Sequence, residues 1–322
     1  MDARLGISGS RAMSRIAVRQ SGVAALVALV LTCDLRKVQA AESYRPAVYS
    51  AGPAFVGEQS LVVFPAGLSR SRSIHLPFPL GVMAFSPDGN ALFAEAGLEA
   101  SEDRPRAGIY RIELNPVRAS ELKGSAGFRS SYGIAVALDI DRLVISGSFK
   151  DGPVGSCGIF ELGLHDGHVQ QLLKSADCSL EEARRSLSLS PDSRRIAAIY
   201  RRSLQLIDVA TGTITTLGVG FQSAGWSPDG KHLAAVEDAK DEATILFETA
   251  HFTREKALPN SELAWSPDSR FLLGLKGSLL CGGELYTLRT INVLTGGGSE
   301  VTNSTCQLVG GPVGWVKAEV GR

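Results

Sequence analysis

The chain has 322 residues, of which 44% are hydrophobic and 20% are charged, and this length allows one large all-β domain or two ordinary domains. Its 33 basic side chains balance 33 acidic ones, so the formal charge at pH 7 is zero and does not indicate a nucleic-acid partner. The short basic clusters Arg194-Arg195 and Arg201-Arg202 stand beside strand-like sequence and are expected to be solvated strand edges.

The first 40 residues have the layout of an export signal. Several arginines precede an apolar stretch over residues 22–33, and Val38 and Ala40 suit cleavage before Ala41. A membrane-spanning helix needs about 20 apolar residues, so this stretch is too short to cross a bilayer comfortably. We therefore expect residues 1–40 to be removed and residues 41–322 to form a single domain in the periplasm or outside the cell.

Two alternatives stay open for the N-terminal segment. Cys33 follows Val30-Leu31-Thr32, which resembles a lipoprotein attachment site, and lipidation there would anchor the protein to a membrane. A retained signal would also give membrane association. Met13 is a second candidate for the true start, besides Met1.

Three strand candidates come next, at 44–50, 60–64 and 72–76, and a repeated segment of ten residues follows them. Four copies share Ser-Pro-Asp followed by Gly or Ser, at 83–92, 187–196, 224–233 and 263–272. A degenerate copy lies at 134–143. Proline presets the backbone of the turn, aspartate bonds its own backbone, and Gly or Ser accepts a left-handed conformation, so each copy predicts a β-hairpin.

A second hairpin follows the first in several copies, and two hairpins make one four-stranded unit. These outer hairpins are predicted at 108–114 with 119–122, at 158–164 with 168–173, and at 203–209 with 213–217. The turn markers Ser86, Ala137, Ser190, Ser227 and Ser266 are 51, 53, 37 and 39 residues apart. These intervals suit four short strands with loops of variable length, and such a period is typical of repeat architectures.

The two ends of the chain complete the pattern. Residues 311–316 resemble an innermost strand, with Trp315 in the place of Trp226 and Trp265, but no turn follows them. The three strand candidates of the N-terminus supply what is missing. The sequence therefore predicts an all-β, six-bladed β-propeller, in which strands from both ends share one blade and remove an exposed sheet edge.

The repeat Trp-Ser-Pro-Asp-Gly-Lys-x-Leu, with a downstream Leu-x-Leu-Ile-Asp-x-x-Thr-Gly hairpin, resembles the TolB-like and WD-repeat-like bacterial propellers over nearly the whole mature chain. The chain departs from the pattern at Leu138-Asp139-Ile140-Asp141, where Pro-Asp-Gly is replaced. The resemblance implies the fold but specifies function weakly, because the same repeats occur in periplasmic scaffolds and beside prolyl-oligopeptidase-type domains.

Four cysteines remain after signal removal, an even number that favours disulfides in an exported protein. Cys157 and Cys178 flank one outer hairpin, and Cys281 and Cys306 flank another, so we predict the pairs Cys157–Cys178 and Cys281–Cys306. Free buried thiols are the alternative. No Cys-x-x-Cys pair or nearby His pair supports a zinc site, and no metal or other cofactor is expected.

A binding site is expected on the face opposite the Ser-Pro-Asp turns, because long loops on a rigid scaffold often carry binding residues. Loops are predicted there at 97–107, 123–132, 146–156, 175–185 and 274–283. Residues just ahead of the innermost strands should ring the mouth of the central channel. The candidates for binding a ligand or partner are Arg129, Tyr132, Arg184, Arg185, Gln222 and Glu262.

The first functional hypothesis is a non-enzymatic scaffold that binds an envelope protein, a peptide or a small ligand, since the sequence has no nucleophile, base and orienting acid in a recognisable pattern and no Gly-x-Ser-x-Gly elbow in its mature part. The second is a propeller enzyme, such as a lactonase, lyase or glycan hydrolase, which requires two acidic or His side chains converging at the channel mouth. Glu262 alone is insufficient. The third is a ligand sensor that acts with a regulator or transporter.

Overall fold

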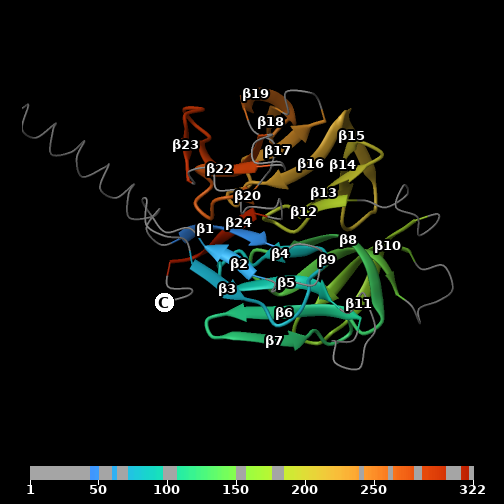
Figure 1. The fold of residues 1–322 in the computed structure, drawn as a ribbon. Coiled ribbons are helices and arrows are strands. Elements are labelled where there is room, and N and C mark those ends of the chain that lie inside the picture. The colour runs from blue at the N-terminus through green and yellow to red at the C-terminus, as the bar shows by residue number, and fades with distance from the viewer. Residues whose placement is uncertain are drawn as a thin grey trace, which may run out of the picture. The chain divides into compact units, whose positions relative to one another are not determined.

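The computed structural model describes residues 44–50, 60–63, 72–96, 107–149, 157–175, 185–238, 243–259, 264–278, 285–301 and 313–318. The chain divides into two compact units, Met1–Ser43 and Tyr44–Arg322, and all described residues belong to the second. These residues form six four-stranded antiparallel sheets, and the expected six-bladed propeller is confirmed (Figure 1). No helix capable of crossing a bilayer occurs among them. The export signal and the Cys33 alternative lie outside the described residues.

Five blades are built from four consecutive strands each, ordered from the innermost to the outermost. Blade one comprises β4 (Met83–Phe85), β5 (Ala91–Ala96), β6 (Gly108–Leu114) and β7 (Val117–Glu121). Blade two comprises β8 (Phe128–Val136), β9 (Arg142–Phe149), β10 (Cys157–Gly163) and β11 (Val169–Lys174). Blade three comprises β12 (Arg185–Leu189), β13 (Arg195–Tyr200), β14 (Ser203–Asp208) and β15 (Ile214–Val219). Blade four comprises β16 (Phe221–Trp226), β17 (His232–Glu237), β18 (Ala243–Glu248) and β19 (Thr253–Pro259). Blade five comprises β20 (Ala264–Trp265), β21 (Phe271–Ser278), β22 (Leu285–Asn292) and β23 (Gly298–Glu300).

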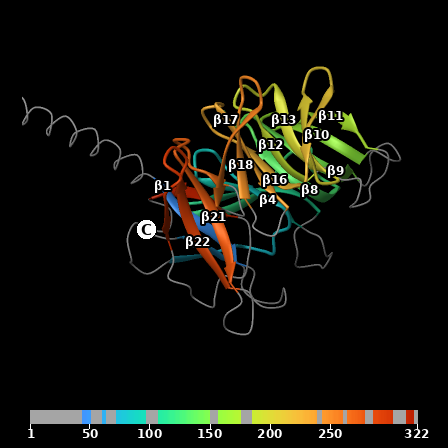
Figure 2. The same cartoon turned by 90° about the horizontal axis from the view of Figure 1, so that it is seen from above.

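Blade six joins the two ends of the second unit, as predicted. Its strands are β24 (Val313–Lys317), β1 (Tyr44–Ser50), β2 (Ser60–Val63) and β3 (Arg72–His75). The innermost strand β24 pairs antiparallel with β1, with Trp315 opposite Pro46 and Gly314 opposite Ala47. The six innermost strands contact one another in a closed ring, β24-β4-β8-β12-β16-β20, and Figure 2 shows several of them side by side. Closure by β24 and β1 therefore fixes the ring between blades five and one.

Apolar side chains fill the spaces between blades, because the two middle strands of a blade are covered on both faces. The middle strands β5, β13, β17 and β18 accordingly read as continuous buried runs rather than as an alternation. Two of the three repeated tryptophans also link neighbouring blades. The indole Nε1 of Trp265 donates to the carbonyl of Gly225 at 2.9 Å, and that of Trp315 donates to the carbonyl of Ala264 at 3.1 Å. The equivalence of these two positions, inferred from the repeats, thus has a structural counterpart.

Each Ser-Pro-Asp turn is held by the same small network, in which the serine is the central residue. In blade three the hydroxyl of Ser190 donates to Asp192 Oδ1 at 2.6 Å and accepts from the amide of Arg195 at 2.9 Å. Asp192 Oδ1 also accepts from the amide of Arg194 at 3.1 Å. The corresponding serines 86, 227 and 266 make the same two contacts and are likewise buried. The predicted backbone bonding by aspartate is confirmed, while the role of the serine was not foreseen.

The residue after each turn aspartate has a positive φ, as expected for this type of hairpin. The angle is 67° at Gly89, 72° at Gly230, 58° at Ser193 and 60° at Ser269. The degenerate repeat keeps the same geometry with Ile140 at a φ of 55°. A β-branched residue disfavours this conformation more strongly than glycine or serine does, so the blade-two turn carries more local strain than the regular copies.

Candidate functional site

The predicted mouth residues lie in strands more than in loops. Arg129 and Tyr132 belong to β8, Arg185 is the first residue of β12, and Gln222 is the second of β16. Arg184 and Glu262 lie outside the described residues. The predicted loops at 123–132, 146–156 and 274–283 are therefore too long, because β8 starts at residue 128, β9 runs to 149 and β21 runs to 278. These strand ends are polar or glycine-rich, so the pattern of hydrophobic residues did not predict that the strands extend this far.

The inner strands of three successive blades are irregular at the predicted mouth positions. In β8, Arg129 pairs with Ser148 and Gly133 pairs with Ser146, so three residues stand opposite one. The register of β12 shifts between Arg185 and Ser188, and that of β16 shifts around Gln222. Bulges of this kind redirect side chains and are over-represented near functional sites. The beginnings of β8, β12 and β16 therefore form a shared structural feature of the face opposite the Ser-Pro-Asp turns, which we call the bulged face.

Side-chain hydroxyls connect the inner strands of blades three and four. Ser186, in the bulge of β12, has a φ of 51°. Its hydroxyl accepts from the amide of Ala224 at 3.0 Å, and the hydroxyl of Ser188 accepts from the amide of Trp226 at 2.9 Å. Gln222 is exposed beside this junction. The exposed amide of Gln222 thus projects from a backbone that its neighbours hold in place.

The inner strands of blades two and three are also packed closely against each other. Gly133 follows the bulge of β8, and a Cβ added there would lie 2.9 Å from Leu187 Cγ and 3.1 Å from the Leu187 amide nitrogen. Tyr132, next to this glycine, is half-buried. Glycine is therefore required at position 133 by packing, and it sets the position of the Tyr132 backbone at the junction of the two blades.

The turn between β13 and β14 adds two arginines to the bulged face. Arg201 and Arg202 are its two central residues, with φ values of 46° and 62°. A two-residue hairpin turn with positive φ at both positions strongly prefers Asn-Gly, because L side chains disfavour the left-handed conformation by roughly 1–2 kcal/mol per residue. Both residues are exposed, as expected of a solvated edge, but they lie in the turn between β13 and β14 and not in a strand.

Contacts to blade four hold the arginine turn in position. Arg202 Nε lies 2.6 Å from Asp238 Oδ2, and its Nη2 donates to the Asp238 carbonyl at 3.0 Å. The Arg202 carbonyl accepts from the amides of Gly220 and Phe221 at 2.8 and 2.9 Å, directly before Gln222. The guanidinium of Arg201 lies 5.4 Å from the centre of the Tyr200 ring. The turn and the bulge of β16 thus form one braced surface that presents guanidinium and amide groups.

Sequence reasoning named Gln222 but missed the role of Arg201 and Arg202. The available signal was the position of two basic residues between the apolar strands 195–200 and 203–208, where turn-forming residues are expected. The turn carries two guanidinium groups, of which that of Arg202 is paired with Asp238. Among the described residues, no group of three or more His, Cys, Asp or Glu side chains is placed to hold a metal ion.

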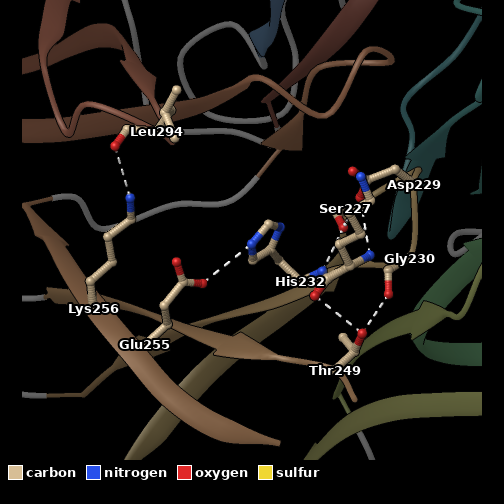
Figure 3. A network of polar contacts seen from close by, with 9 residues as sticks. Ser227, Asp229, Gly230, His232, Thr249, Glu255, Lys256 and Leu294 are labelled. Atoms are coloured by element: carbon tan, nitrogen blue, oxygen red, sulfur yellow. Dashed lines mark hydrogen bonds and ion pairs between the residues drawn. The ribbon is translucent and has the colours of Figure 1, made fainter. Parts of the chain in front are cut away.

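A second polar network lies near the Ser-Pro-Asp turn of blade four (Figure 3). His232 Nε2 lies 3.2 Å from Glu255 Oε2, and its ring stacks on Trp265 with centroids 6.2 Å apart. Lys256 Nζ donates to the carbonyl of Leu294 at 3.2 Å, which ties β19 to the turn of blade five. These contacts join strands and blades to one another, so we assign the network to the stability of the scaffold.

One of the four predicted disulfide cysteines is described. Cys157 is buried, begins β10 and is disulfide-bonded. Cys178, Cys281 and Cys306 lie outside the described residues, so the pairs Cys157–Cys178 and Cys281–Cys306 stay predictions.

No family model and no curated protein matches this sequence. Among solved structures, TolB from Acinetobacter baumannii is similar with a TM-score of 0.62 and 16% identity, over 84% of this chain and 66% of that one. The alignment thus takes in just under two thirds of that protein. A putative TolB from Agrobacterium tumefaciens has a TM-score of 0.53 and 13% identity, over 81% of this chain and 88% of that one. An oligogalacturonate lyase from Vibrio parahaemolyticus has a TM-score of 0.51 and 13% identity, over 76% of this chain and 72% of that one. The TolB-like resemblance is confirmed at the level of the fold.

Proposed function

We propose that the protein is an exported, non-enzymatic propeller that binds a protein or peptide of the cell envelope through its bulged face. The observation that carries this proposal is the Arg201-Arg202 turn, in which two arginines occupy left-handed positions that Asn-Gly would occupy at lower free energy. Strained backbone conformations cluster at functional sites, so this strain supports a functional hypothesis. Export itself rests on the signal-like N-terminus.

The chemistry of the bulged face suits an extended acidic segment. Arg202 uses Nε and Nη2 on Asp238, and its remaining N–H donors together with the guanidinium of Arg201 are the groups offered to a carboxylate. Gln222 offers both a donor and an acceptor to a peptide backbone. The bonds from Gly220 and Phe221 to Arg202 hold these groups in fixed positions. A pre-positioned surface loses less conformational entropy on binding, which favours recognition by a short peptide. If the protein is a ligand sensor, the same surface would bind a small anionic ligand.

An enzyme is the second candidate function, and the lyase neighbour is the observation that favours it. A lactonase, lyase or glycan hydrolase would need two acidic or His side chains converging at the channel mouth. Glu262 is the sequence-based candidate for one of them. Glu237 and Asp238 lie beside the start of β16, but Asp238 is paired with Arg202 and Glu237 with Arg254. The binding function is therefore the simpler proposal.

The test is photo-crosslinking in native cells. A photoreactive residue replaces Gln222, and a control replaces Arg118, which is exposed on the outer strand of blade one. We expect a specific envelope partner to crosslink at position 222 only. The purified partner should then bind the Arg201→Asn/Arg202→Gly variant about 10-fold or more weakly, because central arginines often contribute more than 1 kcal/mol to an interface.

Two results would contradict the proposal. Identical crosslinks at positions 222 and 118, or an unchanged affinity of the double variant, would exclude the bulged face as the binding surface. Turnover of oligogalacturonates or lactones that Glu262→Gln abolishes would instead favour the enzyme.

A further inference from the structure

The outermost strand of blade three differs from those of the other blades in its charge. Sheet edges expose unpaired backbone groups, and proteins protect them with charged residues or proline. Among the outermost strands that the structure describes, β3, β7, β11, β19 and β23 each contain at least one charged side chain. β15, with the sequence Ile-Thr-Thr-Leu-Gly-Val, contains none. The uncharged run extends from residue 209 to residue 228.

The edge formed by β15 is also exposed and partly apolar. β15 ends its sheet and pairs on one side only, with β14 (Figure 1). Val219 is 76% exposed and Ile214 is 38% exposed, and Thr215 and Thr216 between them are exposed as well. An exposed, uncharged edge rich in β-branched residues is a template for pairing with another strand.

The two aliphatic side chains lie on the same face of the blade. Ile214 pairs with Ile207, and Val219 pairs with Ser203. Those partners are four residues apart on β14, and side chains four apart along a strand share a face. The register shift between Leu204 and Gln205 leaves Leu217 as an extra residue, which brings Val219 to the face of Ile214.

From this arrangement we infer that β15 pairs antiparallel with β15 of a second copy of this chain. In the full-length two-fold register, Ile214 stands opposite Val219 of the second copy, and Val219 stands opposite Ile214. Thr215 then faces Gly218, so no like charges meet, and the exposed aliphatic pair forms a contact at both ends. Such a two-fold contact closes on itself and gives a dimer instead of a fibre. This surface is the outer edge of blade three and is independent of the proposed function.

The dimer should be weak and reversible. A ladder of six residues falls short of the roughly 1,000 Å² that stable interfaces bury, and the bulge at Leu217 removes ladder bonds at its centre. We therefore expect a dissociation constant on the order of 100 μM. Introducing lysine at position 215 places a positive charge opposite Gly218 of the other copy on each side of the two-fold axis. It should weaken the dimer about 10-fold or more, because lysine on an edge strand opposes pairing with another strand.

Sedimentation equilibrium of the full chain, expressed for export, tests the dimer between about 10 μM and about 1 mM. We expect a reversible monomer–dimer equilibrium that Thr215→Lys weakens and that Ser120→Lys, on the edge strand β7, leaves unchanged. Val219→Ser serves as a second disruptive variant if Thr215→Lys does not fold. A monomer at every concentration, a dimer that both β15 variants retain, or equal weakening by the β7 control would overturn the inference.

Cysteine crosslinking tests the register. Ile214→Cys mixed with Val219→Cys should give a disulfide-linked dimer, because directly opposite residues of an antiparallel pair have Cα atoms roughly 4.5–5.5 Å apart. Ile214→Cys alone should give much less crosslinked product. Equal crosslinking in the two samples would contradict this register and with it the two-fold pairing of β15.

Discussion

Replacing Arg201-Arg202 by Asn-Gly should stabilise the propeller while weakening partner binding. Both arginines have positive φ, which costs roughly 1–2 kcal/mol per residue relative to a residue that accepts this conformation. The replacement gives up the Arg202 ion pair with Asp238, worth about 0.2–1 kcal/mol at an exposed site, and one hydrogen bond worth about 1 kcal/mol. Glycine also adds about 0.5–1 kcal/mol of unfolded-state entropy. Losing the contact between the Arg201 guanidinium and the Tyr200 ring costs about 0.5 kcal/mol more. The balance is a small net stabilisation, below about 1 kcal/mol.

Equilibrium urea unfolding measures this change as a higher midpoint at an unchanged slope. Ser193→Gly is the matched control, because Ser193 also has a positive φ but lies in a Ser-Pro-Asp turn on the opposite face. It should stabilise the fold to a similar degree without affecting partner binding. A double variant less stable than the wild type would refute the reasoning, since it would show that the arginine contacts outweigh the backbone strain and that stability alone accounts for their presence.

Three further predictions concern the scaffold. Ser190→Ala should destabilise the fold by about 2 kcal/mol, because Ser190 is buried and bonds both Asp192 and the amide of Arg195; an unchanged urea midpoint would contradict this. The hydrogen bond from Ser190 holds the pKa of Asp192 below its usual value, so this carboxylate stabilises the fold above the unfolded pKa of about 3.9 and loses that effect as pH falls through the lower folded pKa. The difference between wild type and Ser190→Ala should therefore shrink between pH 5 and the acid limit of about pH 2, and a constant difference would oppose it. Gly89→Ala should lower the melting temperature and speed proteolysis at the C-terminal strand, because the new Cβ would lie 2.8 Å from the amide nitrogen of Lys317 in blade six; a wild-type melting temperature would argue against this closure contact.

The fold was predictable because the same turn and strand pattern occurs several times in the sequence. The same Ser-Pro-Asp turn precedes the same apolar strand in four places, and Trp315 aligned a lone C-terminal strand with the inner strands of complete blades. That single alignment was enough to predict that the two ends share blade six, which the pairing of β24 with β1 confirms. Redundancy of this kind compensates for the weak signal of any one strand.

The candidate site was predicted less well, because it departs from the repeat. Ser130 and Ser131 extend β8 beyond the apolar core, and polar residues there carry no period-2 signal. A bulge is a mismatch between two strands, so it depends on both partners and cannot be inferred from either alone. The arginine turn had a local signal, but basic residues between strands resemble a solvated edge until their backbone conformation is known.

Backbone strain is compensated differently in the Ser193 turn and in the Arg201-Arg202 turn. On the Ser-Pro-Asp face, the positive φ of Ser193 is accompanied by hydrogen bonds from the Ser190 hydroxyl and the Arg194 amide to Asp192, within the same turn. Those bonds offset the backbone cost locally, so no function needs to be invoked there. The Arg201-Arg202 turn has no aspartate of this kind within it, and the contacts described for Arg202 reach to Asp238 and to the start of β16 instead. The free-energy cost of its backbone conformation is therefore coupled to the geometry of the bulged face. Substitutions in this turn should change partner binding and stability in opposite directions, and the other variants proposed for the scaffold should not.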